Sequence, residues 1–247
     1  MVDMLPNYFD GQVAERYDAG SPEMFEPDVL GPTVDVLVDL ADGQPALELA
    51  IGTGRVALPL SERGVRVHGI ELSQAMVDQL RTKPGAAEIE VAVGDMTTTR
   101  VDGTFGLVYL VFNTIGNVTT QDGQVAVFET AAAHLRPGGS FLIETGVPIL
   151  RRLPAGERFA VFDHTDAHLG IDEYDVATQL TWSHHYSSTD GSTYRRSSVP
   201  FRYTWPAELD LMARIAGMRL SERWADWDRS PFTAESSKHV SVWVKPD

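Results

Sequence analysis

The 247-residue sequence contains no cysteine, so disulfides, thiolate nucleophiles and cysteine-bound metals are excluded. No apolar run approaches the ~20 residues that a membrane-spanning helix requires. The first residues, "MVDMLPNYFDGQVAERYD", are polar and acidic, unlike a signal peptide. We therefore expect a cytoplasmic protein without a membrane partner.

Basic side chains are scarce. The 20 lysines and arginines stand against 35 aspartates and glutamates, which gives a formal net charge of −15. Such a chain has no excess of cations to displace the counterions of a nucleic acid, so we expect no nucleic-acid partner. The charge suits a neutral or cationic small molecule, although it also serves solubility alone. Apolar residues make up 43% of the chain, enough for a sizeable core.

Between residues 45 and 146, short apolar runs alternate with segments of helical periodicity. This alternation predicts parallel βαβ units and hence an α/β fold. Ser73 is a suitable N-cap for one of the helices. We expect strands at 46–51, 65–71, 89–93, 105–112 and 140–146, helices at 55–63, 73–80 and 123–135, and a turn at 136–139.

The flanking segments have other patterns. Residues 1–44 are predicted to be mostly helical. In 174–204, β-branched and aromatic residues alternate around Asp190–Gly191, which is typical of a β-hairpin. A helix is expected at 205–217, followed by an antiparallel pair at 218–227 and 238–246. No repeat or linker occurs, so we predict a single domain over 1–247.

The segment "GTGRVA", residues 52–57, matches Gly-x-Gly-x-x-Gly/Ala between a predicted strand and a predicted helix. Gly52 and Gly54 allow a tight turn and the close approach of a nucleotide. Glu71 ends the next strand, where a carboxylate can accept hydrogen bonds from both hydroxyls of a ribose. Alternatively, Glu71 complements the positive end of the following helix.

Nicotinamide dinucleotides and S-adenosylmethionine both fit this arrangement. Glu48 lies within the first strand, four residues before Gly52. A carboxylate there would repel a pyrophosphate, whereas it favours the sulfonium and ammonium of S-adenosylmethionine. Asp95 can accept the adenine amino group, with Met76 and Met96 against the ring; core packing is an equal alternative for Met76. These residues favour S-adenosylmethionine.

The segments "ELAIGTGR", "GIELSQAM", "VAVGDM", "FGLVYLVFNTIGN" and "HLRPGGSFLIE" resemble the successive motifs of class I S-adenosylmethionine-dependent methyltransferases. The resemblance implies a Rossmann-like seven-stranded mixed sheet of order 3-2-1-4-5-7-6, with helices on both faces and the last strand antiparallel. We expect an inserted antiparallel β segment after strand five. The cofactor contacts implied by the resemblance are Glu48, Ala50, Gly52, Gly54, Glu71, Leu72, Met76, Asp95 and Met96.

Two further segments resemble parts of small-molecule methyltransferases. "AERYD" (14–18) is similar to their N-terminal helix, which closes over the cofactor, and its Tyr17 would reach toward the methionine carboxylate. Arg55 could pair with the same carboxylate or lie on a solvated helix face. "VFNTIGNVTTQ" (111–121) is similar to sugar-amine and glycine N-methyltransferases, which would place Phe112, Asn113 and Thr114 near the transferred methyl.

We expect methyl transfer to a nitrogen or oxygen atom of a small molecule, for instance in secondary metabolism. A neutral amine needs no strong base, whereas an alcohol or phenol does. The candidates for a base or other catalytic role are His164, His168, His184, His185 and Asn113, with a surface or structural role as the alternative for each histidine. Adjacent strand residues point to opposite faces, so only one of His184 and His185 can face a pocket.

Two other functions remain open: an NAD(P)-dependent oxidoreductase on the same fold, and a non-catalytic S-adenosylmethionine-binding protein. The lysines, Lys83, Lys238 and Lys245, lie outside the segments expected to form a pocket, which weakens the oxidoreductase alternative. We expect no metal, because no histidine and aspartate cluster has ligand spacing.

The predicted domain has four parts, and both a monomer and a homodimer are compatible with it. They are a helical lid (1–44), a cofactor-binding core (45–146), an inserted substrate cap (147–205), and a closing helix with strands six and seven (206–247).

Overall fold

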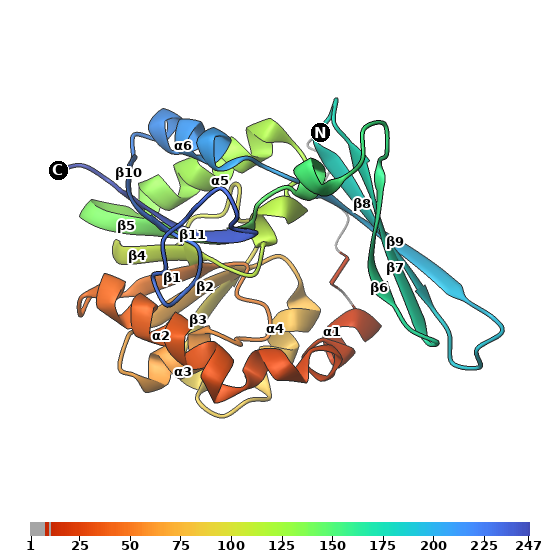
Figure 1. Ribbon diagram of the computed structural model, residues 1–247. Helices are drawn as coiled ribbons and strands as arrows, with labels where there is room; N and C mark the ends of the chain where they lie inside the picture. The colour runs from red at the N-terminus through yellow and green to blue at the C-terminus, as the bar shows by residue number, and fades with distance from the viewer. Residues whose placement is uncertain (1–7, 10) are drawn as a thin grey trace.

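The computed structural model describes residues 8–9 and 11–247, and its central element is a seven-stranded sheet (Figure 1). The strand order, β10-β11-β5-β4-β1-β2-β3, confirms the predicted order 3-2-1-4-5-7-6. Only β11 departs from the parallel direction, because it runs antiparallel to both β5 and β10. The strands are Ala46–Leu49 (β1), Val67–Glu71 (β2), Glu90–Val93 (β3), Phe105–Leu110 (β4), Leu135–Gly146 (β5), Arg219–Trp224 (β10) and Lys238–Val244 (β11).

Helices cover both faces of this sheet, with α2 and α3 on one side and α5 and α6 on the other (Figure 1). Their bounds are Gln12–Arg16 (α1), Pro27–Ala41 (α2), Ala57–Glu62 (α3), Gln74–Arg81 (α4), Gln121–His134 (α5) and Pro206–Ile215 (α6). Short 3-10 turns are Asp18–Gly20 (η1), Pro22–Phe25 (η2), Ala86–Glu88 (η3), Thr114–Asn117 (η4) and Ile149–Arg152 (η5). None of the helices in these described ranges is long and apolar enough to cross a membrane.

The local signals in the sequence explain most of these elements. Every residue of β4 is buried, as its continuous apolar run predicts for a strand covered on both faces. The hydroxyl of Ser73 accepts a hydrogen bond from the backbone N–H of Met76, which confirms the predicted N-cap of α4. The turn expected at 136–139 is instead an irregular start of β5, where Gly138 has φ +72° and the pairing with β4 shifts register.

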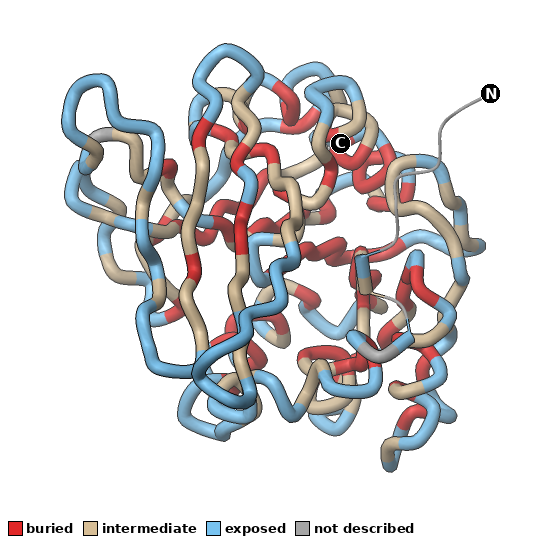
Figure 2. The backbone as a smooth tube through the Cα atoms, turned by 90° about the vertical axis from the view of Figure 1, so that its right-hand side faces the viewer, coloured by how far each residue is buried: buried red, intermediate tan, exposed pale blue. Residues whose placement is uncertain are grey.

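A separate four-stranded antiparallel sheet is inserted between β5 and α6, in the order β6-β7-β8-β9. Its strands are Phe159–His164 (β6), His168–Asp175 (β7), Leu180–Ser187 (β8) and Arg195–Arg202 (β9). The predicted hairpin corresponds to β8 and β9, whereas β6 and β7 were not predicted. Figure 2, which views the molecule from this side, shows strands that are mostly intermediate or exposed, unlike the buried central sheet.

A buried polar cluster fixes the base of the inserted sheet to the α/β body. Arg202, at the end of β9, is only 4% exposed, and its Nη2 lies 2.6 Å from Oε1 of Glu208 in α6. Its Nη1 donates to the side-chain carbonyl of Gln124 in α5, which is fully buried. Gln124 in turn donates to the carbonyls of Ile115 and Arg202. The inserted sheet is thereby held against η4, α5 and α6.

Candidate functional site

A cavity opens where β1, β2 and β3 end. We call it the first cavity. Ligands of open α/β sheets bind beyond the carboxyl ends of the strands, so the place agrees with the fold. The predicted cofactor residues that line it are Tyr17, Ala50, Gly52, Glu71, Leu72, Met76, Asp95 and Met96.

The glycine turn after β1 forms one wall of this cavity. Ala50 and Gly52 adopt left-handed backbone conformations, with φ +55° and +57°, which turn the chain sharply at the strand end. Gly54 does not line the cavity. A Cβ on Gly54 would lie 2.4 Å from a methyl carbon of Leu80 in α4, so glycine is needed there for packing between the turn and the helix.

Glu71 braces the glycine turn against α4. Its Oε2 accepts a hydrogen bond from the N–H of Gly52 at 2.8 Å, and its Oε1 accepts one from the N–H of Ser73 at 2.8 Å. Burial raises the pKa of this carboxyl, and the backbone N–H groups act in the opposite direction. Each carboxylate oxygen keeps a lone pair for a further donor, so the brace and the predicted ribose contact are compatible.

Glu48 lies behind the cavity wall rather than on it. The side chain is 4% exposed, and its Oε2 accepts a hydrogen bond from the Tyr109 hydroxyl at 2.9 Å. Burial raises the pKa of this carboxyl to about 8, while the nearby Arg55 guanidinium favours its charged form. A direct contact between Glu48 and the cationic part of a cofactor stays a prediction.

Tyr17 is held over the first cavity by contacts of the segment that follows α1. The neighbouring Asp18 accepts a hydrogen bond from the Thr53 hydroxyl at 2.6 Å and pairs with Lys83 at 2.5 Å. Lys83 also donates to the carbonyl of Thr53 at 2.7 Å. Burial raises the pKa of the Tyr17 hydroxyl. The N-terminal segment is thus tied to the glycine turn, which the sequence did not indicate.

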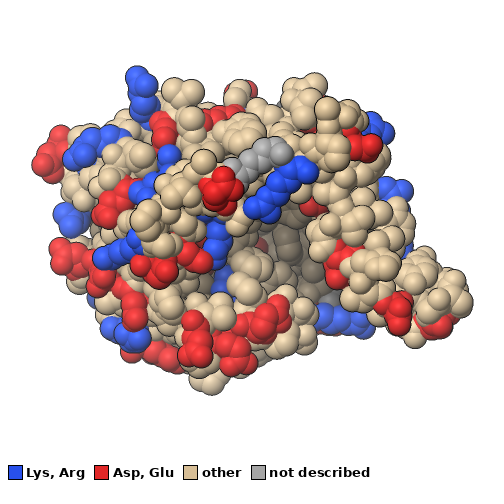
Figure 3. Space-filling view, viewed as in Figure 1, with Lys and Arg blue, Asp and Glu red and all other residues tan. Residues whose placement is uncertain are grey.

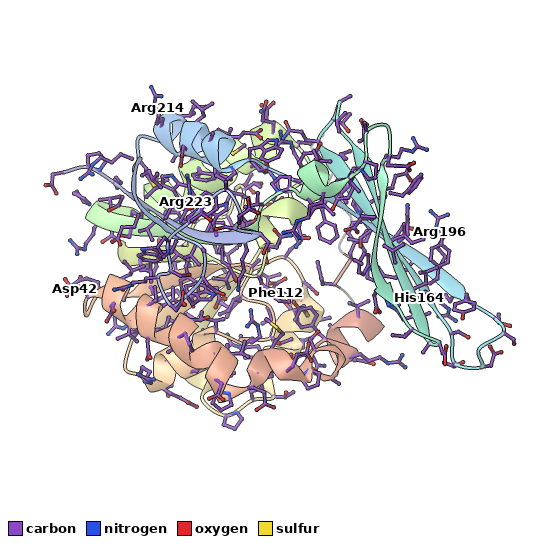
Figure 4. All side chains as sticks on the ribbon, in the orientation of Figure 1. Asp42, Phe112, His164, Arg196, Arg214 and Arg223 are labelled. Atoms are coloured by element: carbon purple, nitrogen blue, oxygen red, sulfur yellow. The ribbon has the colours of Figure 1, made fainter. Side chains whose placement is uncertain are left out.

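A second cavity, of about 970 Å³, adjoins the first and shares Tyr17, Thr114 and Asn117 with it. Phe112 and Asn113, also on its wall, have φ +61° and +58°. Such left-handed conformations of non-glycine residues cost of order 1–3 kcal/mol each and cluster at ligand sites. Figure 4 shows Phe112 near the centre of the molecule, and Figure 3 shows the hollow between the body and the inserted sheet.

Three polar side chains shape this second cavity. The Oδ1 of Asn113 accepts hydrogen bonds from the Thr145 hydroxyl at 2.5 Å and from the Gly146 N–H at 3.1 Å. The Oε2 of Glu144 accepts one from the N–H of Phe112 at 2.9 Å. Lys238 also lines the cavity, so the expectation that no lysine lies in a pocket-forming segment was wrong. Its Nζ pairs with Asp226 at 2.7 Å.

Arg55 lies outside the first cavity, and its guanidinium stands 4.8 Å from the centroid of the Phe112 ring. It also donates to the carbonyl of Met24 at 3.4 Å. Arg55 and Glu144 line a further cavity beside α2. The predicted pairing of Arg55 with the cofactor therefore stays a prediction, and the structure gives it a cation–π contact at the rim of the second cavity.

The candidate histidines of the inserted sheet lie on neither of these two cavities. His184 lies on the face opposite to His185 and contacts Ser198 and Glu173. His164 is exposed, and Figure 4 places it on the inserted sheet, well away from Phe112. His185 lies on the same face as Ser183 and Asp172, which line a third cavity, beneath the inserted sheet. Of the weak catalytic candidates, Asn113 alone reaches the second cavity.

Several further lining residues come from distant segments: Asn117 and Val118 belong to the stretch 111–121 that the resemblance singled out, whereas Pro200 and Phe201 carried no sequence signal. Asn117 and Val118 reach the first cavity from the end of η4, and Pro200 reaches it from β9. Phe201, next to Pro200, lines the second and third cavities. Among the residues that the structure describes, no group of three or more histidines, aspartates or glutamates could hold a metal ion.

Comparisons with known proteins agree on one kind of protein. A family model described as a methyltransferase domain matches residues 46–139. The cypemycin N-terminal methyltransferase of a Streptomyces species is 27% identical over 96% of this chain and 97% of that protein. The solved CcbJ methyltransferase from Streptomyces caelestis is 34% identical, covers 96% of this chain and 97% of its own, and superimposes with a TM-score of 0.83.

A more distant structure shares the fold. It is that of S-adenosylmethionine-bound CalS10, an amino pentose methyltransferase from Micromonospora echinaspora, at 19% identity and a TM-score of 0.69. The match covers 95% of this chain and 97% of that one.

Proposed function

The chain belongs to the family of S-adenosylmethionine-dependent methyltransferases, and on this basis we propose that it methylates a nitrogen atom of a small-molecule amine. Its cofactor is S-adenosylmethionine and its activity is methyl transfer. The oxidoreductase and the non-catalytic binding protein are set aside, because the relatives named above are methyltransferases.

The first cavity is our proposed cofactor site. When bound, S-adenosylmethionine supplies an activated methyl group on a sulfonium. Glu71 would accept hydrogen bonds from the ribose and Asp95 from the adenine amino group, while Met76 and Met96 would pack against the ring. Tyr17 would face the methionine end. This assignment is supported by the position of these side chains on one cavity, where Glu71 and Asp95 each offer a carboxylate.

One observation supports nitrogen as the methylated atom. In the described chain, the second cavity offers the Glu144 carboxylate, the Asn113 amide, the hydroxyls of Tyr17, Thr114 and Thr145, and the Lys238 ammonium, which pairs with Asp226, but no histidine. A carboxylate attracts an amine in its cationic form, and a neutral amine attacks without a strong base. An alcohol or phenol would need a base on this wall. A curated relative is named as an N-terminal methyltransferase, and a solved one as an amino pentose methyltransferase, which agrees with the proposal.

The experiment is a turnover assay with purified protein and S-adenosylmethionine. Amino sugars, peptide amines and the matching alcohols would be offered side by side, and the methylated product identified by mass spectrometry. We expect methylated amines, with a raised KM in Glu144→Gln because that variant lacks the attracting charge. Thr145→Val is a matched control on the same wall that retains Glu144. Methylation of the alcohols alone would overturn the proposal.

The remaining parts of the prediction complete this proposal. We assign residues 1–44 to a lid over the cofactor and residues 147–205 to a cap that selects the acceptor. The positions of Tyr17 on the first cavity and of Phe201 on the second support this division. A role in secondary metabolism follows from the names of the relatives. The cytoplasmic location and the choice between monomer and homodimer remain predictions from the sequence.

A further inference from the structure

A chain of hydrogen-bonded side chains crosses the inner face of the inserted sheet. The Oδ2 of Asp163 lies 2.5 Å from Nδ1 of His168, whose Nε2 lies 3.0 Å from Nδ1 of His185. The Nε2 of His185 lies 3.4 Å from the hydroxyl of Ser183. The side chain of Ser183 also lies beside Asp172, its cross-strand neighbour, and lowers the pKa of that carboxyl. Strands β6, β7 and β8 thus contribute to one continuous path.

The two ends of this path lie in different surroundings. Asp163 is a half-exposed carboxylate on the outer strand, with 43% of its side chain accessible. Asp172 lines the third cavity together with Ser183, and the third cavity shares Asn113, Thr145 and Phe201 with the second. The path therefore joins the acceptor side of the molecule to solvent.

Packing around the two imidazoles protects the middle of the path. The ring of Phe162 meets that of His185 edge-on, with centroids 5.3 Å apart. This position of Phe162 requires the glycine at 170, since a Cβ there would lie 2.2 Å from the Phe162 ring. A register shift between Val161 and Asp163 lets β6 present both Phe162 and Asp163 to these histidines. Phe162 thus packs against His185, while His168 keeps 26% of its side chain accessible and Asp163 keeps 43%.

The third cavity also contains a polar atom without a partner. The Thr181 residue is only 6% exposed, and its buried hydroxyl has no hydrogen bond. Thr181 and Ser183 are two residues apart in β8, and their cross-strand partners Tyr174 and Asp172 are two residues apart in β7. All four side chains therefore lie on the same face of the sheet. Buried polar groups normally find a partner, so this one is available to a ligand or a water beside Asp172.

We propose that Asp172 receives the proton that an ammonium acceptor loses before methylation, and that Ser183, His185 and His168 pass it to solvent beside Asp163. The inference rests on the proposed amine substrate. The transfer to Asp172 is direct or passes through one water, as general bases commonly act. Asp172 is the proton acceptor; the other residues act through it.

The protons balance along the path. With Asp172 ionised, the Ser183 hydroxyl donates to it, His185 Nε2–H donates to Ser183, and an imidazolium at His168 donates to both His185 and Asp163. With Asp172 protonated and His168 neutral, every one of these bonds except that to Asp163 reverses direction. The two arrangements hold the same number of protons, so one converts into the other by hops within existing hydrogen bonds. The imidazolium of His168 then releases its proton to water.

The charges around the path are few. His185 faces His168, Asp163 and Asp172, with His184 on the opposite side of the sheet, and burial lowers its pKa. Asp172 faces Ser183, the Tyr174 hydroxyl at 3.4 Å and His185; burial raises the pKa of Asp172. The guanidinium of Arg202, which borders the same cavity, is bound to Glu208. Both shifts favour the neutral forms, of His185 in the middle of the path and of Asp172 at its inner end.

The test reads the histidine tautomers and needs no acceptor. Nitrogen NMR of histidine-labelled protein in complex with S-adenosylhomocysteine, from pH 5 to 9, reports which ring nitrogen of His185 carries the proton. We expect His185 to change tautomer as Asp172 titrates, and expect Asp172→Asn to abolish that change. His164→Gln, a change at an exposed residue of β6, is the matched control and keeps it. A His185 tautomer that does not respond to Asp172→Asn overturns the relay.

Steady-state kinetics with an amine that the protein methylates give a second readout. We expect Asp172→Asn to lower kcat/KM at pH 7 about tenfold or more, and expect the loss to shrink as the pH rises, because the amine then arrives neutral. His168→Gln is expected to shift the pH profile with little change in KM. A loss that is equal at every pH would show a merely structural role and overturn the proposal. If no amine is methylated, the proposed function fails, while the tautomer experiment still decides the relay.

Discussion

Glu48 shows how burial alters a charged residue in the central sheet. Its pKa of about 8 in the folded protein exceeds the ordinary value of 4.5, so the native state retains a proton that the unfolded chain releases. The associated stability is complete below pH 4.5 and is lost as the pH rises through 8, at about 1.4 kcal/mol per pH unit. Glu48→Gln keeps a similar shape without the titration.

We therefore expect Glu48→Gln to gain stability relative to the wild-type protein between pH 5 and pH 8. Urea denaturation at several pH values in that window measures the difference in the free energy of unfolding. Tyr109→Phe, which removes a hydroxyl that lowers the pKa of Glu48, is expected to extend the loss of stability to higher pH. A difference between Glu48→Gln and wild type that stays constant with pH would contradict the assigned burial effect.

Glu71 accepts hydrogen bonds from the glycine turn and from α4, and we propose that it also binds the ribose, so a single alanine substitution would change both. Loss of hydrogen bonds to a charged group costs about 1.5–3 kcal/mol, so we expect Glu71→Ala to weaken cofactor binding roughly ten- to a hundred-fold. The same substitution also frees the N–H groups of Gly52 and Ser73. Calorimetry with S-adenosylhomocysteine and its 2′-deoxy analogue separates the two effects. Only the wild type should bind S-adenosylhomocysteine more tightly than the 2′-deoxy analogue. If folded Glu71→Ala shows the same difference in affinity between the two ligands as the wild type, the ribose contact is refuted.

At the scale of elements, the segment from α1 to η1 closes one side of the first cavity. We expect Tyr17→Phe to raise the apparent cofactor constant several-fold while the fold survives, because the hydroxyl is lost and the ring stays. Asp18→Asn, which weakens the contacts to Thr53 and Lys83, should raise the same constant and make this segment more sensitive to protease. An unchanged cofactor constant in both variants would show that the segment is not part of the cofactor site.

The sequence predicted the elements whose packing is regular. The buried run of β4 and the capped helix α4 were identified because apolar spacing and Ser73 are local signals. Strands β6 and β7 were missed because their inner residues, such as Asp163, His168 and Asp172, are polar and face each other or a cavity, so no apolar alternation marks them. Pro200 and Phe201 could not be assigned to cavities, since only the tertiary fold brings β9 beside η4.

The partners of buried charged residues could not be predicted from the sequence either. Glu48 was interpreted as a partner of a cationic ligand, whereas its nearest hydrogen-bond donor, Tyr109, comes from a neighbouring strand. The order of the strands followed from the motif sequence, but the partner of each buried carboxylate depends on register. Asp18 and Lys83 meet across the glycine turn for the same reason.

At the scale of the whole molecule, one joint holds the two sheets in place. In the pair of Arg202 and Glu208 the arginine is buried and the glutamate partly buried, and breaking such a pair costs at most about 3–5 kcal/mol because the remaining charge loses its partner. We expect Arg202→Met to destabilise the protein by that order and to abolish turnover, while cofactor affinity changes little. The double variant Arg202→Met/Glu208→Gln should recover much of the stability. Equal unfolding of the single variant and the wild type would show that the joint is unimportant.

Shortening the inserted sheet is a second way to test the cap. Replacement of residues 183–197 would remove most of β8, which pairs with both β7 and β9, so the whole sheet would be lost. We expect nearly unchanged affinity for S-adenosylmethionine and no turnover. Replacement of the exposed tip, residues 189–193, by a two-residue turn is the milder control and should keep activity. Normal methylation after the larger deletion would show that the sheet does not form the acceptor site.

The four strands of the inserted sheet are consecutive in the chain and pair only with one another, and both ends of the segment return to the same cavity wall. In the gene, a single recombination event that spans the codons for residues 147–204 would therefore exchange nearly the whole cap. Of the residues on the first cavity, such an exchange would replace Pro200 alone. On the proposed assignment of the cap to acceptor selection, lineages would acquire new acceptors by exchanging this one contiguous segment, with no accompanying change in the codons that encode the glycine turn.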